Sequence, residues 1–150
     1  MDEIRKTAAA IYASGTFSNC RSVEQAIVFV LTGQELGLQP MIAMRSLQVV
    51  KGKICLSADM MEAVALKRCS SFDLVESTAD RCTYTTKRYT SSEPQSYTYT
   101  MEEAVRSGIT KGEFWRKYPE AMLRARCKAT LARIAYPDLL AGIYDPEEMK

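Results

Sequence analysis

The sequence predicts an α+β fold in which a small antiparallel sheet, a hairpin plus further strands, packs with about five helices. Helix start and stop signals dominate both ends of the chain. The middle holds a glycine turn between two apolar runs, then two segments rich in Thr and Tyr, which strands favour. The order of helices, hairpin, helix, strands and helices differs from the regular alternation of a parallel α/β sheet.

The first part of the chain is predicted to be helical. Residues 2–13 are rich in alanine and favour a helix. The segment Ser22-Val23-Glu24-Gln25 has the pattern of a capping box and begins a second helix, which ends at Gly37. We expect residues 1–21 to form a helical arm and residues 22–150 to form the main domain.

The middle of the chain predicts strands. Lys51-Gly52-Lys53 lies between Leu47-Gln48-Val49-Val50 and Ile54-Cys55-Leu56, the arrangement of a β-hairpin. A helix is expected next, over residues 58–68. Three further strands are expected at residues 72–76, 81–90 and 95–101.

A long helix is predicted from Pro119 to Ala135. At 100° per residue, one apolar stripe contains Leu123, Cys127, Thr130 and Ile134, and an alanine stripe (Ala125, Ala129, Ala132) lies roughly opposite. Arg126 and Arg133 project along one edge between the stripes, and Arg124 and Lys128 lie on the other. A helix of this kind has two packed faces and two basic edges.

Composition excludes several classes of protein. With 47% hydrophobic and 25% charged residues the chain has ordinary globular composition. No apolar run approaches the ~20 residues of a membrane span. We expect no signal peptide at residues 1–5, because two acids and no apolar stretch follow Met1. The sequence has no histidine, which excludes Ser-His-Asp catalysis and His-ligated zinc. The five irregularly spaced cysteines are expected to be buried and to pack as small apolar residues. We expect a reducing compartment, the cytoplasm, as the location of the protein.

Positive charge is concentrated near the C-terminal helix. The net charge of the chain is +2, yet residues 111–133 hold seven basic and two acidic side chains. Such a segment is typical of a polyanion site, and a solvated helix face is the alternative. Trp115 lies among these residues, so it is a candidate for stacking on nucleic-acid bases or, alternatively, an anchor in the core.

Two further sites have weaker signals. Lys51 and Lys53 flank a glycine and are able to reach a phosphate, but the segment lacks the Walker A pattern, so ATP hydrolysis has no support. Asp59 and Glu62 are three residues apart and suit a divalent cation, but first-turn acids also stabilise a helix by themselves. We therefore expect no nucleotide or metal cofactor.

Four segments, in this order, resemble the phage single-strand annealing proteins of the RecT/Redβ (Bet) family. The segments are Gly33-Gln34-Glu35-Leu36-Gly37-Leu38-Gln39-Pro40; Val49-Val50-Lys51-Gly52-Lys53 with Leu56-Ser57-Ala58-Asp59-Met60-Met61; Trp115-Arg116-Lys117-Tyr118-Pro119-Glu120-Ala121-Met122-Leu123-Arg124-Ala125-Arg126; and Arg133-Ile134-Ala135-Tyr136 with Ala141-Gly142-Ile143-Tyr144-Asp145 and the acidic pair Glu147-Glu148. The resemblance covers residues 22–148.

The resemblance implies a function without a catalytic centre: ATP-independent binding of single-stranded DNA and annealing of complementary strands. It also implies a ring or helical filament of identical subunits, with a phage exonuclease or a host single-strand-binding protein as further partners. Arg126, Arg133 and Arg124 fall on basic positions of the family, and Lys53 lies in a hairpin where members use lysine. Looser DNA-binding candidates are Lys51, Lys87, Arg88, Lys111 and Lys128, together with Trp115.

Two other functions are compatible with the residues. The basic helix suits a protein-interaction or assembly domain that binds an acidic partner. The Asp59 and Glu62 pair suits a metal-dependent nuclease, although no convincing catalytic cluster accompanies it.

Overall fold

The computed structural model describes residues 1–149 and confirms the α+β class. These residues form eight α-helices, two 3-10 helices and two separate antiparallel sheets of two and three strands. The sequence predicts one sheet and about five helices. The described residues differ from this prediction in having two sheets and more helices. The chain separates into two compact units, one from Met1–Ser57 with the segment that begins at Gly142, the other from Ala58–Ala141.

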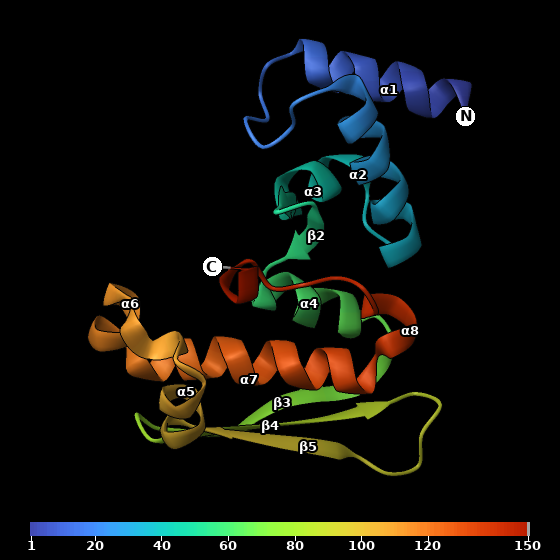
Figure 1. Cartoon of the computed structure of the whole chain (residues 1–150). Helices are drawn as coiled ribbons and strands as arrows, with labels where there is room; N and C mark the ends of the chain where they lie inside the picture. The colour runs from blue at the N-terminus through green and yellow to red at the C-terminus, as the bar shows by residue number, and fades with distance from the viewer. Residues whose placement is uncertain (150) are drawn as a thin grey trace. The chain divides into compact units, whose positions relative to one another are not determined.

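Figure 1 labels most of the elements of each unit. The first unit contains α1 (Asp2–Ala13), α2 (Val23–Leu36), α3 (Pro40–Ser46), β1 (Leu47–Val50), β2 (Lys53–Leu56) and η2 (Pro146–Met149). The second contains α4 (Ala58–Ala65), β3 (Cys69–Ser77), β4 (Arg81–Arg88), β5 (Gln95–Thr100), α5 (Met101–Ser107), η1 (Ile109–Lys111), α6 (Glu113–Lys117), α7 (Pro119–Ala135) and α8 (Pro137–Leu140).

Local signals place α2 as predicted. The Ser22 side chain accepts a hydrogen bond from the backbone N–H of Gln25 at 3.0 Å, and the helix ends at Gly37, whose φ of 75° favours glycine. In the preceding loop, the side-chain amide of Asn19 donates to the carbonyls of Met44 and Leu47, at 3.0 and 2.7 Å. These two bonds tie the loop to the junction of α3 and β1.

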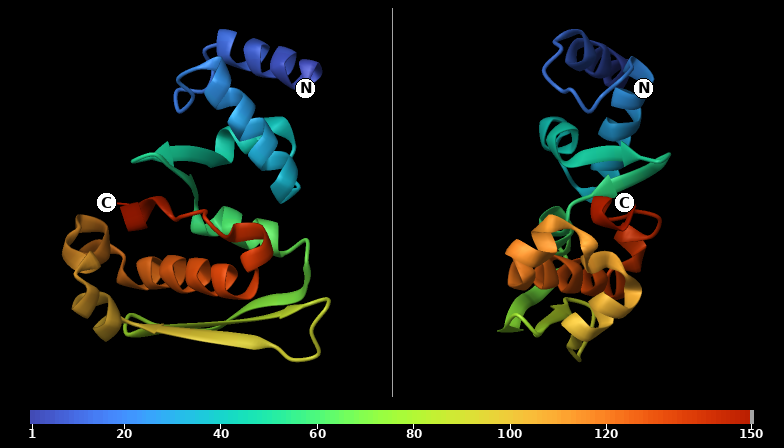
Figure 2. Two further views of the ribbon diagram at one scale, coloured as in Figure 1. Left: turned by 45° about the vertical axis from the view of Figure 1, so that its right-hand side comes forward. Right: turned by 60° about the vertical axis from the view of Figure 1, so that its left-hand side comes forward.

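The hairpin of the first unit is extended by the C-terminal segment. Lys51 and Gly52 form its turn, with φ values of 52° and 77°, which suits a two-residue hairpin loop. Tyr144 pairs with β2 in parallel: its carbonyl accepts from the N–H of Leu56 at 2.9 Å, and its N–H donates to Ile54 at 3.2 Å. Figure 2 shows the hairpin projecting from the helices of its unit.

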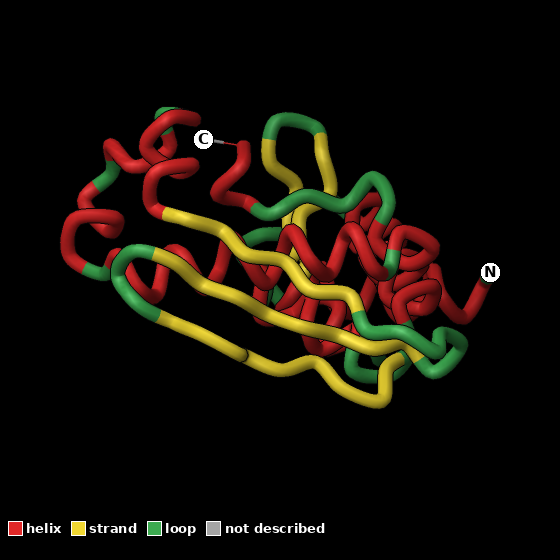
Figure 3. Tube along the Cα trace, turned by 90° about the horizontal axis from the view of Figure 1, so that it is seen from below, coloured by secondary structure: helices red, strands yellow, loops and turns green. Residues whose placement is uncertain are grey.

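The three-stranded sheet of the second unit has the order β3-β4-β5. Cys82, Tyr84 and Thr86 alternate along β4 and are buried, because this face packs on α7. The other face is polar; there the hydroxyls of Thr83 and Thr98 lie 2.7 Å apart across the strands. In Figure 3 no helix of the unit crosses this face. One face buried and one in water is the usual state of an antiparallel sheet.

Helix α7 lies between the sheet and α4 (Figure 1). Cys127 faces the sheet, where its thiol donates to the carbonyl of Cys82 at 3.3 Å. Just after α7, the fully buried Tyr136 brings its hydroxyl to 2.7 Å from that of Thr86. Since the Thr86 hydroxyl also donates to the carbonyl of Ser71 at 2.9 Å, it accepts from Tyr136.

Several boundaries differ from the predictions. Helix α4 ends at Ala65 rather than at residue 68, because the carbonyl of Arg68 accepts from the N–H of Tyr89 and the chain enters the sheet. Strand β3 is longer than predicted and contains register shifts, one between Leu74 and Glu76. On α7, the predicted core residue Ile134 is 56% exposed, whereas Leu131 is 1% exposed.

All five cysteines are free and buried, as predicted. Burial raises the pKa of Cys82 to about 12, and burial also raises the pKa of Cys127. Both thiols therefore stay protonated at neutral pH and pack as small apolar groups.

Among residues 1–149, no single helix is long and apolar enough to cross a membrane; only the bent pair α2 and α3, taken together, meets that test.

The packing of α2 on α3 generates the first prediction. A Cβ added at Gly33 would lie 2.5 Å from the Cβ of Ala43 and 3.3 Å from the carbonyl oxygen of Leu38. Although alanine favours helix, we expect Gly33→Ala to destabilise the protein by about 1–3 kcal/mol because α3 must move away. Urea unfolding checks this. Gly112→Ala, where nothing lies within 4 Å of the added Cβ, is the control. Equal stability of the two variants would contradict the packing.

The ion pair between Arg88 and Asp138 generates a prediction on pH. The guanidinium donates two hydrogen bonds to the carboxylate, at 2.6 and 2.9 Å, and these lower the pKa of Asp138 from 3.8 to about 2 against the opposing effect of burial. A lowered carboxyl pKa stabilises the fold above pH 3.8, and this contribution is lost as the pH falls toward 2. The advantage of the wild type over Asp138→Asn, less than about 1 kcal/mol for so exposed a pair, should disappear over this range. Thermal unfolding against pH measures it, and a constant difference down to pH 2 would contradict the assignment.

Candidate nucleic-acid interface

The two basic edges of α7 are not equivalent in the structure. The buried positions of the helix are Leu123, Cys127, Ala129, Leu131, Ala132 and Ala135. At about 100° per residue these cover a broad arc centred near Lys128. The opposite direction is that of Arg126 and Arg133. The edge with Lys128 therefore turns into the fold. The edge with Arg126 and Arg133 lies opposite, but both side chains are half-buried, and the Nε atom of Arg126 is fully buried.

Lys128 is held by carboxylates of α4. Its Nζ lies 2.9 Å from Oδ1 of Asp59, 3.5 Å from Oε2 of Glu62 and 5.7 Å from the centre of the Tyr84 ring. Burial tends to lower the pKa of Lys128, but the hydrogen bond to Asp59 and the neighbouring charges raise it overall, so the side chain is charged at neutral pH. These contacts give Lys128 a role in joining α7 to α4.

Arg124, on the same edge, also contacts groups within its unit. Its Nη1 donates to the hydroxyl of Ser77 at 3.0 Å and lies 3.8 Å from a carboxylate oxygen of Glu120. Glu120 also accepts a hydrogen bond from Ser77 at 3.2 Å. This cluster connects the first half of α7 to the end of β3.

Arg88 and Lys87, the candidates on β4, point to opposite faces of the sheet. Besides Asp138, Arg88 donates to the carbonyl of Ala135 at 2.8 Å and lies 4.8 Å from the centre of the Tyr136 ring. It therefore fixes the end of α7. Lys87 alternates with the buried Thr86 and is half-buried on the polar face of the sheet.

Arg126 and Arg133 are half-buried and lie along one line of α7. Seven residues at 1.5 Å per residue separate them by about 10 Å along the axis. This line lies toward β5, since the opposite edge contacts β3 through Ser77. The charge of Arg126 reaches Tyr97 of β5: burial raises the pKa of Tyr97, and Arg126 opposes that rise.

The aromatic side chains of α6 and of the residue after it differ from one another in exposure, and the one predicted to stack on bases is buried. Trp115 is only 7% exposed, so the structure favours the alternative of a core anchor. Its neighbours Phe114 and Tyr118 are 61% and 57% exposed, and their rings are stacked at 6.4 Å between centres and 27° between planes. This pair was not among the candidates predicted from the sequence. The spacing of the two rings, i and i+4, was the signal that indicates neighbouring side chains on one face of a helix.

The remaining cationic candidates are exposed. Lys111 ends η1, close in sequence to the aromatic pair. Lys51 and Lys53 belong to the hairpin of the first unit, where Lys53 Nζ lies 5.9 Å from the centre of the Tyr144 ring. The hairpin turn keeps both ammonium groups in solvent.

Asp59 and Glu62, considered as a metal pair, both contact the ammonium group of Lys128. A cation already occupies the position that a metal ion would need. Across residues 1–149 no group of three or more His, Cys, Asp or Glu side chains is placed to hold a metal ion.

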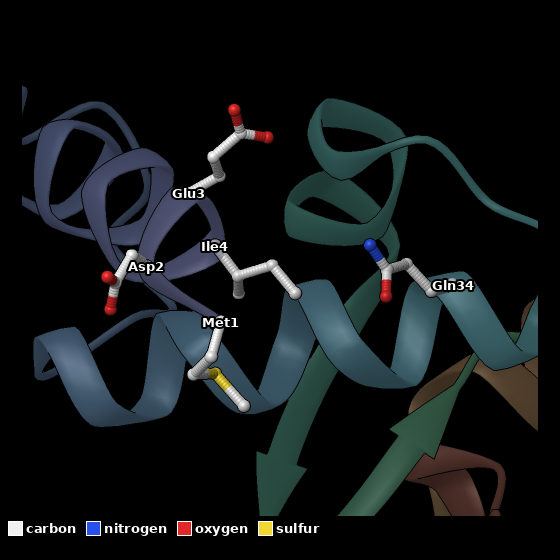
Figure 4. Close-up of a pocket in the computed structure, with 5 residues that line it drawn as sticks. All are labelled: Met1, Asp2, Glu3, Ile4 and Gln34. Carbon is white, nitrogen blue, oxygen red and sulfur yellow. The ribbon is translucent and has the colours of Figure 1, made fainter.

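A shallow pocket lies between the start of α1 and α2 in the first unit (Figure 4). Met1, Asp2, Glu3, Ile4 and Gln34 line it. Its two carboxylates point away from one another in the close-up, and none of its side chains is basic.

Comparison with known proteins gave no match, either to a family model or to a curated protein sequence.

The contacts of Lys128 predict that its charge contributes more to stability than the charge of an exposed lysine. Lys128→Met removes the charge and leaves Asp59 and Glu62 facing each other, so we expect a loss of about 1–2 kcal/mol in the free energy of unfolding. The matched control is Lys117→Met: Lys117 pairs with Glu113 at 2.7 Å, but both side chains are more than half exposed, so the expected loss is below about 0.5 kcal/mol. Urea unfolding of both variants measures the difference. A smaller loss for Lys128→Met than for the control would contradict this role.

Proposed function

We propose that this protein binds single-stranded DNA along the edge of α7 that carries Arg126 and Arg133, and that it anneals complementary strands without ATP. The observation that carries the proposal is the rotation of α7. Three of the seven basic side chains of residues 111–133 are engaged in ion pairs within their unit, namely Lys117, Arg124 and Lys128. Arg126 and Arg133 are the basic pair on the edge opposite Lys128, where each side chain is half-buried and leaves part of its surface in solvent.

Two guanidinium groups on one line suit a phosphate backbone. Arginine binds phosphate through several donors in a fixed planar arrangement. Contacts to phosphates carry no sequence information, so binding would be independent of base sequence and sensitive to salt. Annealing needs this mode, because the pairing edges of the bases must stay free.

The four segments that resemble the RecT/Redβ family support the same function. Several of their distinctive residues have a clear role in this fold: Gly37 ends α2, Pro119 begins α7, and Tyr136 is fully buried. Tyr144 of the last segment pairs with the hairpin of the second. A shared fold would place these residues in the same roles, and we propose a core of the RecT/Redβ type on that basis.

Assembly of several copies along one strand completes the proposal. A net charge of +2 gives each subunit weak attraction for DNA. A ring or helical filament would connect many weak sites and increase the overall affinity through effective concentration.

The test is annealing of two complementary oligonucleotides without ATP, at low and high salt. We expect Arg126→Ala/Arg133→Ala to abolish annealing at moderate salt and to reduce the slope of log affinity against log salt by about 1.4, from about 0.7 per phosphate contact. The matched control is Arg68→Ala/Arg106→Ala, which removes the same charge from exposed positions of the same unit. Thermal unfolding of each variant confirms folding.

Three outcomes would reject the proposal. Equal losses in both double variants would mean that net charge alone drives binding. Absence of binding by the wild type at low salt would favour a protein-interaction domain whose basic helix recognises an acidic partner. Loss of full-length oligonucleotide with Mg²⁺ would favour a nuclease.

A further inference from the structure

The exposed rings of Phe114 and Tyr118 form a surface that the fold does not use. Phe114 belongs to α6 and Tyr118 lies between α6 and α7, and each leaves more than half of its surface in water. Large aromatic side chains normally bury most of their area, so two neighbouring exposed rings indicate a binding surface. Trp115 between them anchors α6 in the core and thereby holds the pair in place.

We propose that Phe114 and Tyr118 are a stacking platform for a base of single-stranded nucleic acid. Their rings are near-parallel, at 27°, so they present flat faces in a similar direction. Every base has a π-face, and stacking on aromatic side chains recognises single strands without regard to sequence. This inference rests on the proposed function and adds a second kind of contact to it.

The charge around the pair favours a nucleic acid over an apolar protein surface. Lys111 and Arg116 lie within a few residues of the rings; both are exposed, and neither forms an ion pair with a residue in the described part of the chain. An aromatic pair flanked by such cations matches a base and its phosphate together, whereas a partner protein with an apolar surface would have to desolvate the cations.

The platform also lies within the length of a short oligonucleotide from Arg126. Tyr118 immediately precedes α7, about 12 Å along the axis from Arg126 at 1.5 Å per residue. One short oligonucleotide would therefore contact the arginines through its phosphates and the rings through a base. Stacking uses the face of a base and leaves its pairing edge free, which is compatible with annealing.

The experiment compares binding of labelled oligothymidine with that of an abasic oligomer of the same length and charge, by fluorescence anisotropy. We expect the wild type to prefer the base-containing strand by about fivefold or more, since a stacked base contributes about 1–3 kcal/mol. Phe114→Leu/Tyr118→Leu should lose this preference and keep its affinity for the abasic strand. Tyr118→Phe should retain the preference, and Tyr89→Leu, which removes a tyrosine 69% exposed at the end of β4, is the matched control.

The outcomes separate the platform from the proposed function. If the wild type binds both strands equally, or if the double leucine variant keeps the preference, the platform is rejected while DNA binding stands. If the wild type binds neither strand at low salt, the proposed function fails and the platform with it. A double leucine variant whose only change is a smaller assembly by sedimentation would show that the rings contact another copy of the chain, and would also reject the platform.

Discussion

The rotation of α7 about its own axis is the constraint on which the rest of the second unit depends. The helix is covered by the sheet on one side and by α4 on another. Its small residues allow this: Ala129 and Ala132 are fully buried, and Cys127 fits against the backbone of β4. Lys128 adds to this arrangement, because its ammonium group lies between the carboxylates of Asp59 and Glu62. A turn of the helix would expose the buried apolar positions and separate these charges.

The same rotation decides on which edge of α7 each basic residue lies. The sequence shows seven cations in residues 111–133, but it does not show which side of the folded helix each one occupies. Arg124 and Lys128 share one edge and contact groups of their own unit, and Arg126 and Arg133 share the other edge. Cations that are equivalent in the sequence thus lie in different surroundings in the structure.

Local interactions made much of the fold predictable. The cap at Ser22, the positive φ at Gly37 and the glycine turn of the hairpin depend on neighbours in the sequence. Three other features depend on distant residues and were not predictable. Tyr144 pairs with β2, almost ninety residues before it, and the buried arc of α7 follows from the position of α4. The exposure of Phe114 and Tyr118, with Trp115 buried between them, likewise required the tertiary structure.

The contact between the edge with Arg126 and Arg133 and the phosphate backbone is the central proposal for DNA binding. A structure of the protein bound to oligothymidine tests this most directly, because it locates phosphates relative to both edges of α7. We expect phosphate oxygens within hydrogen-bond distance of both guanidinium groups, with Lys128 still between Asp59 and Glu62. A strand bound along another surface, with no phosphate at either arginine, would contradict the account.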